Sequence, residues 1–238
     1  VGGFLAAGMS CDDMVKAVMR IQRSEMWDMG GIGGLLKGQL FQNILEANLP
    51  VKDIKDCKIP FGATAFDLLR LSTHCLIDGD LATVIRASAS FPGLFQPVIL
   101  HSRPHIDGGV FDFNGLMALP GIPENNLIVN ILVSRSQLSS TVPSSKYPHA
   151  KVVSIVLENI PSVSPFSMQS EGPRAYQMAR RAMSLALTSV SPIKLALSHS
   201  LYIVDPILLD SPTSPPVCLV ESVLMKRERE KDIEEENV

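Results

Sequence analysis

The sequence lacks an excess of positive charge and has few cysteines. Its 21 Lys and Arg residues are outnumbered by 24 Asp and Glu residues, for a net charge of −3, and no cationic face suited to nucleic-acid phosphates is visible. The four cysteines form no C-x-x-C pair, and the five histidines show no spacing such as H-E-x-x-H. We therefore expect no nucleic-acid partner and no metal, and neutral thiols in a reducing compartment.

Long apolar runs are also missing. The most apolar long stretch, residues 183–204, is interrupted by Pro192, Lys194 and His199, whereas a membrane-spanning helix needs about 20 consecutive apolar residues. We expect no transmembrane segment in this chain. The composition, 46% hydrophobic and 19% charged, is typical of a globular protein, and 238 residues suffice for an α/β domain with a buried core.

Predicted helices and strands alternate along the chain. Apolar spacing and capping residues predict helices over residues 3–7, 11–23, 39–47, 81–89 and 171–189. Apolar runs predict strands over residues 59–66, 98–100, 104–106, 127–133, 152–157 and 202–209. The strand at 59–66 fits burial on both faces of a parallel sheet, and Pro206 makes the last strand an edge. This alternation predicts an α/β layer fold.

The most informative stretch lies between residues 85 and 113. It contains a helix end of small residues, the turn Phe91-Pro92-Gly93, a short apolar strand and the corner Asp107-Gly108-Gly109. The chain opens with Val1-Gly2-Gly3 and continues into a small-residue helix. Acyl transfer needs a nucleophile, a base and oxyanion donors. Gly108 and Gly109 allow positive φ and carry no Cβ, so the chain can turn sharply and aim the Asp107 carboxylate at a pocket.

Together these motifs resemble the patatin-like phospholipase family. The resemblance implies a three-layer α/β/α fold with a mainly parallel central sheet. It also implies a lipid acyl hydrolase that cleaves ester bonds of phospholipids or related acyl lipids with a Ser-Asp dyad. In that family the Asp of the Asp-Gly-Gly corner is the base, which gives this role to Asp107. Such a dyad requires no metal or organic cofactor.

The same resemblance places the nucleophile outside the sequence. Val1 and Gly2 match the last two positions of the family's Gly-x-Ser-x-Gly elbow, so the serine would precede Val1, and Val1 and Gly2 would supply the elbow and an oxyanion donor. No other Gly-x-Ser-x-Gly occurs in the chain. We therefore expect a patatin-like domain that lacks its N-terminal strands, its glycine-rich oxyanion loop and its nucleophile, and that is inactive as given.

Domain limits and partners follow from the same interpretation. We expect an incomplete patatin-like domain over residues 1–210, followed by a Pro-rich linker and a charged tail over residues 211–238. The expected partner is an acyl lipid or phospholipid, with transient contact at a membrane surface. The expected location is the cytoplasm or the membrane periphery.

Several polar residues near Asp107 have weaker claims to chemistry. Asp112 is a second carboxylate nearby, and Asp67, after the strand at 59–66, is expected to cap a loop. Ser88 and Ser90 lack an elbow context, so packing or capping is their expected role. The glycine-rich residues 30–38 predict a loop without the order of a phosphate-binding motif, because Lys37 precedes Gly38. A flexible lid over the substrate is a secondary interpretation of that loop.

Two other functions remain open from the sequence. The first is a non-catalytic module that keeps the patatin fold and binds lipid or a protein partner. The second is an esterase with a Ser-His-Asp triad, in which His105 would share the face of Asp107 because the two residues are two positions apart on a strand.

Overall fold

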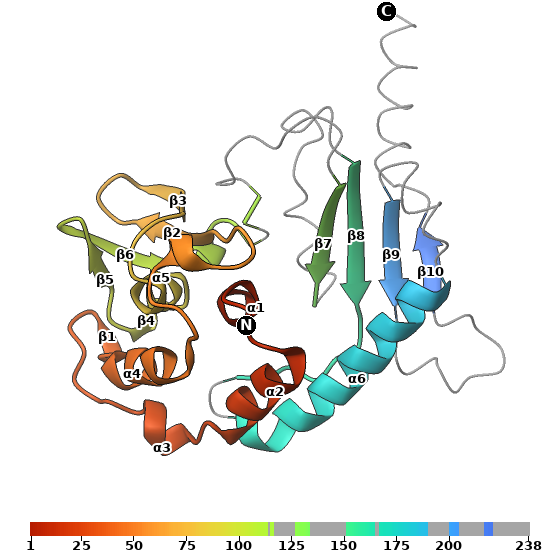
Figure 1. Ribbon diagram of the computed structural model, residues 1–238, viewed down its shortest axis with the longest axis horizontal. Coiled ribbons are helices and arrows are strands. Elements are labelled where there is room, and N and C mark those ends of the chain that lie inside the picture. The colour runs from red at the N-terminus through yellow and green to blue at the C-terminus, as the bar shows by residue number, and fades with distance from the viewer. Residues whose placement is uncertain are drawn as a thin grey trace, which may run out of the picture. The chain divides into compact units, whose positions relative to one another are not determined.

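The computed structural model describes residues 1–113, 115–116, 127–133, 151–164, 167–189, 200–204 and 217–220. The chain forms two compact units, Val1–Pro120 and Gly121–Val238 (Figure 1). Both contain helices and strands, and the predicted α/β class is confirmed. The domain limits expected at residues 210 and 211 stay a prediction, and so does the three-layer arrangement.

The first unit contains most of the predicted elements. Its helices are α1 (Gly2–Ala6), α2 (Cys11–Arg20), α3 (Arg23–Met26), α4 (Gln39–Asn48) and α5 (Leu81–Ser88), with short 3-10 turns η1 (Ile54–Asp56) and η2 (Gly108–Val110). Its strands are β1 (Gly34–Leu36), β2 (Ala63–Asp67), β3 (Ser72–Leu76), β4 (Gly93–Phe95), β5 (Val98–Leu100) and β6 (Arg103–Asp107).

A four-stranded sheet with the order β3-β2-β6-β5 organises this unit. Every neighbouring pair is antiparallel, and Ala65 of β2 lies opposite Asp107 of β6. The parallel pairing expected for residues 59–66 is therefore wrong. Both faces of β2 are nevertheless buried, because Ala65 packs beneath α5 and the ring of Phe66 lies 4.2 Å, between centroids, from the ring of Phe111. Strand β2 is thus buried on both faces although both of its neighbours are antiparallel.

Helix α5 is the central packing element of the first unit. Asp80 is its N-cap, as predicted, and accepts a hydrogen bond from the N–H of Thr83 at 2.8 Å. Its alanines are buried on two faces, one against the sheet and one against the neighbouring helices. Ala87 packs with Ala65 and Val98 of the sheet, whereas Ala82 packs with Phe4, Met14 and Leu45 of the neighbouring helices. Because alanine allows close approach on both sides, α5 joins the sheet to α1, α2 and α4.

The N-terminal helices largely follow their sequence signals. Ser10 caps α2 by accepting a hydrogen bond from the N–H of Asp13 at 3.2 Å, and Gly8 ends α1 with a φ of 94°. Helix α2 ends at Arg20, three residues before the predicted end, because Gln22 and Glu25 form a capping box that starts α3.

The glycine-rich segment is more ordered than the predicted loop. It contains β1, which pairs in parallel with β4, so that Gly34 lies opposite Gly93. A Cβ on Gly34 would overlap the backbone of Phe95, so glycine is needed for this close approach. Asp28 also accepts hydrogen bonds from the N–H groups of Gly38 and Leu40, at 2.9 and 3.0 Å, at the start of α4. These contacts tie the segment to α4 and β4, and a free lid is not what the structure shows.

The second unit contains β7 (Leu127–Leu132), β8 (Lys151–Leu157), α6 (Met168–Ser189), β9 (Ser200–Val204) and β10 (Val217–Val220). Its sheet has the order β10-β9-β8-β7, with parallel pairing from β7 to β9 and antiparallel pairing of β10. Strand β9 is therefore interior, whereas an edge strand was expected. The strand ends at Val204, and Pro206, on which the expectation was based, lies outside the described residues. Strand β10 was not predicted.

In the second unit, alternate residues of β8 pack against helix α6. Val153, Ile155 and Leu157 form one face of β8 and pack against Ala182 of α6. Val156, on the opposite face, is also fully buried, which is typical of a strand inside a parallel sheet. Among the described residues, no helix has the length and apolar character needed to span a bilayer.

Candidate active site

The candidate site is built around Asp107, the last residue of β6. Its backbone N–H donates to the carbonyl oxygen of Ser90 at 3.0 Å, just beyond the end of α5. Its side chain begins the 3-10 turn η2, because Oδ1 accepts a hydrogen bond from the N–H of Gly109 at 2.8 Å. Within the described part of the chain this is the single hydrogen bond to the carboxylate. The predicted position at a strand-to-loop corner is confirmed.

Burial raises the pKa of Asp107 above its ordinary value, and the hydrogen bond from Gly109 opposes this shift only in part. Removing water from a carboxylate disfavours its charged form unless enough donors replace that water. A carboxylate with a raised pKa accepts protons more readily than an exposed one, which suits a general base.

The two glycines after Asp107 have a different role from the one predicted. Neither has a positive φ. A Cβ on Gly108 would lie 2.6 Å from the carbonyl carbon of Thr64, so glycine is needed here because β2 passes too close for a side chain. A Cβ on Gly109 would lie 3.1 Å from Oδ1 of Asp107. Close packing against β2, and not left-handed backbone, therefore fixes the corner.

Val1 and Gly2 stand at the start of α1, where Val1 is the N-cap and its carbonyl oxygen accepts a hydrogen bond from the N–H of Leu5 at 3.1 Å. Gly3 faces α5 so closely that a Cβ would lie 2.5 Å from Cδ1 of Ile85. Val1 itself is 77% exposed.

Helix α5 positions both parts of the candidate site. Ile85 contacts the start of α1, and Ser90, which follows the helix, holds the backbone of Asp107. The structure therefore brings the opening of the chain and the Asp107 corner to the same helix. Their separation, expected to be below about 10 Å for a dyad that must make direct contact, stays a prediction.

Ser90 has a packing role, as expected. It is fully buried, and its hydroxyl donates to the carbonyl oxygen of Arg86 at 2.7 Å. Asp112 is also buried, and its backbone N–H donates to the carbonyl oxygen of Gly108 at 2.9 Å. Both residues thus support the corner through backbone contacts.

Arg86 is a supporting residue that the sequence did not reveal. It lies buried on α5 and donates to Oε1 of Gln42 and to the carbonyl oxygen of Lys37, both at 2.7 Å. Burial lowers its pKa, and the charge of Asp28 opposes that shift. The available signal was a lone arginine within an otherwise small and apolar helix.

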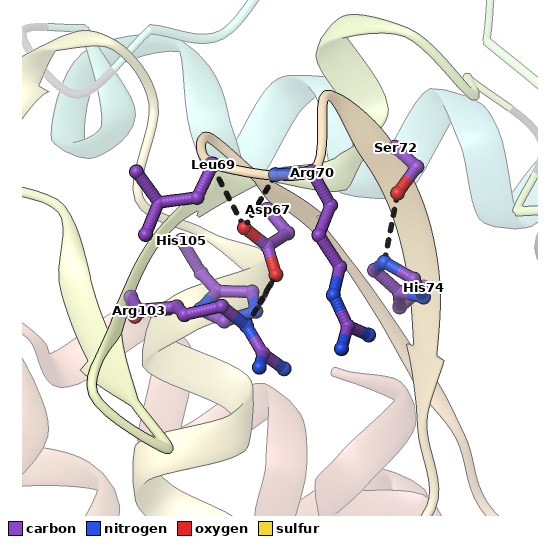
Figure 2. A network of polar contacts seen from close by, with 7 residues as sticks. All are labelled: Asp67, Leu69, Arg70, Ser72, His74, Arg103 and His105. Carbon is purple, nitrogen blue, oxygen red and sulfur yellow. Dashed lines mark hydrogen bonds and ion pairs between the residues drawn. The ribbon is translucent and has the colours of Figure 1, made fainter.

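Asp67 caps a loop, as predicted. Its carboxylate is fully buried and accepts hydrogen bonds from the N–H groups of Leu69 and Arg70, at 2.9 and 3.1 Å, and from Nε of Arg103 at 2.6 Å (Figure 2). Burial by itself would raise the pKa of Asp67, but the donors from Arg70, Leu69 and Arg103 outweigh it and hold the pKa below its usual value. This carboxylate is a fully bonded structural group.

His105 belongs to the surroundings of Asp67. Its ring is buried, with Nδ1 at 2.9 Å from the carbonyl oxygen of Arg103 and Nε2 at 3.8 Å from the Asp67 carboxylate. Figure 2 shows the ring beside Asp67. These contacts engage His105 in holding β2 and β6 together, and they do not favour a triad with Asp107.

Other reactive groups are dispersed. In the residues that the structure describes, no three His, Cys, Asp or Glu side chains gather closely enough to hold a metal ion. Cys57 and Cys75 have pKa values raised by burial, which favours the neutral thiol, whereas Cys11 is exposed.

A family model described as Patatin-like phospholipase matches residues 1–120, about half of the chain. The match includes the opening glycines, α5, the turn before β4 and the Asp107 corner. It therefore covers the whole candidate site. The chain belongs to the patatin-like phospholipase family, and this membership supports lipid acyl hydrolase activity in general.

Proposed function

We propose that Asp107 is the general base of a Ser-Asp dyad that hydrolyses carboxylic ester bonds of phospholipids or related acyl lipids. We place the proposed serine directly before Val1, because Val1 and Gly2 match the last two positions of the family's Gly-x-Ser-x-Gly elbow. The observation that carries the proposal is the position of Asp107, partly buried at the end of β6, with a raised pKa and one donor to its carboxylate. Such a group differs from Asp67, whose oxygens are taken up by structural hydrogen bonds.

The proposed reaction uses Asp107 twice. The serine oxygen attacks the ester carbonyl carbon while its proton passes to Asp107, and the tetrahedral intermediate then expels the alcohol, which takes up that proton. Water next attacks the acyl-enzyme, again giving a proton to Asp107, and the serine recovers the proton as the fatty acid leaves. No metal or organic cofactor enters this sequence.

The start of α1 is proposed to stabilise the oxyanion. In a strand-turn-helix elbow, the backbone N–H of the residue after the serine points into the oxyanion site. That residue would be Val1, with Gly2 next to it in the elbow. The position of Val1 as the N-cap of α1 supports this role, because the N–H groups at the start of a helix have no partner within the helix.

The chain of 238 residues contains no Gly-x-Ser-x-Gly sequence, so we expect it to be inactive by itself. It should not hydrolyse a p-nitrophenyl acyl ester above background, and a fluorophosphonate probe should label none of its serines. Stoichiometric labelling of a serine such as Ser88 or Ser90 would contradict the proposed placement of the nucleophile.

The natural coding sequence upstream of Val1 supplies the main test. We expect it to encode Gly-x-Ser directly before Val1, and we expect the extended protein to hydrolyse acyl esters. In that protein Asp107→Asn should lower kcat at least about 10²-fold, because the amide cannot accept the serine proton. The exposed Asp78, changed to Asn, is the matched control and should retain activity.

Two outcomes would decide against the dyad. An unrelated residue before Val1 would favour the alternative function, a non-catalytic module that binds lipid or protein. Near wild-type turnover in a folded Asp107→Asn enzyme would show that Asp107 is a turn residue.

A further inference from the structure

Two hairpin turns lie together at the end of the sheet that is remote from Asp107. One turn follows Asp67 between β2 and β3, and the other precedes Arg103 between β5 and β6. Because β2 and β6 are antiparallel with Asp67 opposite His105, both turns lie at the same end of the sheet. The N–H of Leu68 donates to the carbonyl oxygen of Pro104 at 3.0 Å and joins them. We call residues 68–71 and 101–103 the hairpin end.

Two leucines of the hairpin end face solvent. Leu69 is 66% exposed and Leu71 is 74% exposed. Leu71 also has a φ of 52°, in the left-handed region that bulky residues rarely adopt and that glycine or asparagine would occupy with less strain. Neither burial nor backbone preference accounts for leucine at position 71. Strain of this kind at an exposed position points to a function of the side chain.

The turn that carries these leucines is held in place by Asp67. One carboxylate oxygen accepts the N–H groups of both Leu69 and Arg70, and the other accepts Nε of Arg103 from the second hairpin (Figure 2). Because the fully buried carboxylate fixes the backbone of the turn, Leu69 and its neighbours are presented at defined positions.

The hairpin end carries positive charge within an acidic chain. Residues 68–71 and 101–103 contain Arg70 and Arg103 and no Asp or Glu, and Arg103 is paired with the adjacent Asp67, whereas the whole chain has a net charge of −3. Arg70 is exposed, and within the described part of the chain its side chain has no ion-pair partner. Figure 2 shows the guanidinium groups of Arg70 and Arg103 on the same side of Asp67. Exposed leucines beside arginines complement a layer of lipid phosphates above acyl chains.

We propose that the hairpin end docks on the surface of an anionic phospholipid bilayer. Leu69 and Leu71 enter the boundary between headgroups and acyl chains, and Arg70 faces the phosphates, while the ion pair of Arg103 with Asp67 holds the turn. Two leucines and one unpaired cation give weak, reversible binding, suited to a protein that leaves the surface again. The proposal extends the lipid substrate class of the proposed function to a docking surface, and it does not depend on the chemistry of Asp107.

The test is sedimentation of the 238-residue chain with vesicles of phosphatidylcholine and phosphatidylserine, compared with vesicles of phosphatidylcholine alone. We expect binding to the mixed vesicles that weakens with added salt, because screening reduces the attraction of Arg70 for phosphate. Arg70→Gln should lower the partition coefficient about fivefold. The exposed Lys55, changed to Gln, removes one cation elsewhere and should have a smaller effect.

Leu71→Asn separates binding from folding. The apolar side chain is lost, so partitioning should fall about tenfold, whereas the thermal midpoint should stay the same or rise because asparagine tolerates a positive φ. Ile32→Asn is the matched control, since Ile32 is 89% exposed and lies outside the hairpin end.

Absence of binding to the mixed vesicles would overturn the proposal. Equal binding by wild type, Arg70→Gln and Leu71→Asn would also overturn it and would place any membrane contact elsewhere. Loss of binding in both variants, with both controls retaining it, would support the hairpin end as the docking surface. None of these results requires turnover, so failure of the proposed dyad would leave the measurement interpretable.

Discussion

The two ends of the sheet in the first unit hold two carboxylates in different ways, Asp67 at the end of β2 and Asp107 at the end of β6. At the first end, Asp67 is fully buried, accepts three hydrogen bonds and has a lowered pKa. At the other end, Asp107 is only partly buried, accepts one hydrogen bond from Gly109 and has a raised pKa. At Asp67 the donors outweigh the effect of burial on the pKa, whereas at Asp107 burial is the larger influence and one N–H opposes it only in part. The number of donors is therefore one clear difference between the two carboxylates.

This difference separates a structural role from a chemical one. The donors that lower the pKa of Asp67 also occupy its oxygens, which makes it a poor proton acceptor for a substrate. Asp107 keeps acceptor capacity because, among the described residues, its carboxylate accepts one hydrogen bond, from the N–H of Gly109. We therefore expect substitution of Asp67 mainly to lower stability, and substitution of Asp107 mainly to lower activity.

The largest effect on stability is expected for Asp67→Asn. The amide oxygen can still accept the N–H groups of Leu69 and Arg70, but its NH₂ group then faces Nε of Arg103, so two donors meet where an ion pair was. The pKa of Asp67 is lowered in the fold, so its stabilising contribution is present above the unfolded pKa and is lost as pH falls through the folded pKa. Urea unfolding of wild type and variant should therefore differ most at neutral pH and converge in acid.

A matched control for this prediction is Asp78→Asn, which removes an exposed carboxylate and should leave unfolding nearly unchanged. An Asp67→Asn protein as stable as the control at neutral pH would show that the Arg103 contact contributes nothing, and the contrast between the two ends would fail.

The sequence revealed the local parts of both ends. Asp67 directly follows an apolar run, Asp107 begins Asp-Gly-Gly, and Asp80 precedes the helix that it caps, so each role could be inferred from adjacent residues. Contacts between distant segments were not accessible in the same way. Arg86 reaches Gln42 and Lys37, which are 44 and 49 residues away, and no local pattern specifies these partners.

The direction in which β2 pairs with its neighbours could not be predicted from the sequence. The run ending at Asp67 was expected in a parallel sheet because both of its faces are apolar, but α5 and Phe111 bury an antiparallel strand equally well. The positive φ expected at Gly108 failed for a related reason. Glycine can be required by backbone freedom or by lack of space, and only the position of Thr64 shows that space is the cause.

The next effect in size is expected for Gly108→Ala. A methyl group would lie 2.6 Å from the carbonyl carbon of Thr64, and because this neighbour is backbone it cannot rotate away. Overpacking of this kind costs about 1–3 kcal/mol, and the corner must shift to relieve it. Denaturant unfolding measures the cost, and in an active extended protein kcat should fall with KM little changed, because the displaced group is the base.

Gly172→Ala is the control for the added methyl group. Its Cβ would meet only Cγ of Met168, at 3.8 Å, within α6, so the substitution should be neutral or stabilising by about 0.5–1 kcal/mol. If Gly108→Ala behaved in the same way, close packing against β2 would not be what fixes the Asp107 corner.

The smallest and most discriminating effect is expected for the stability of Asp107→Asn. Asparagine keeps the shape and the oxygen that accepts the N–H of Gly109, but it removes the charge. Because burial raises the pKa of Asp107 in the fold, the native state binds more protons than the unfolded state between the unfolded and folded pKa values. Stability of the wild type therefore falls as pH rises through that interval, and the full penalty is present above it.

Asp107→Asn should consequently have a higher thermal midpoint than wild type at neutral pH, and the difference should shrink toward about pH 4, near the ordinary pKa of an aspartate. Asp67→Asn should show the reverse order of midpoints at neutral pH. A variant that gains stability while it loses activity shows that the original side chain serves function and lowers the stability of the fold. If Asp107→Asn instead lowered the midpoint as much as Asp67→Asn does, both carboxylates would be structural, and the assignment of Asp107 as a base would lose its physical support.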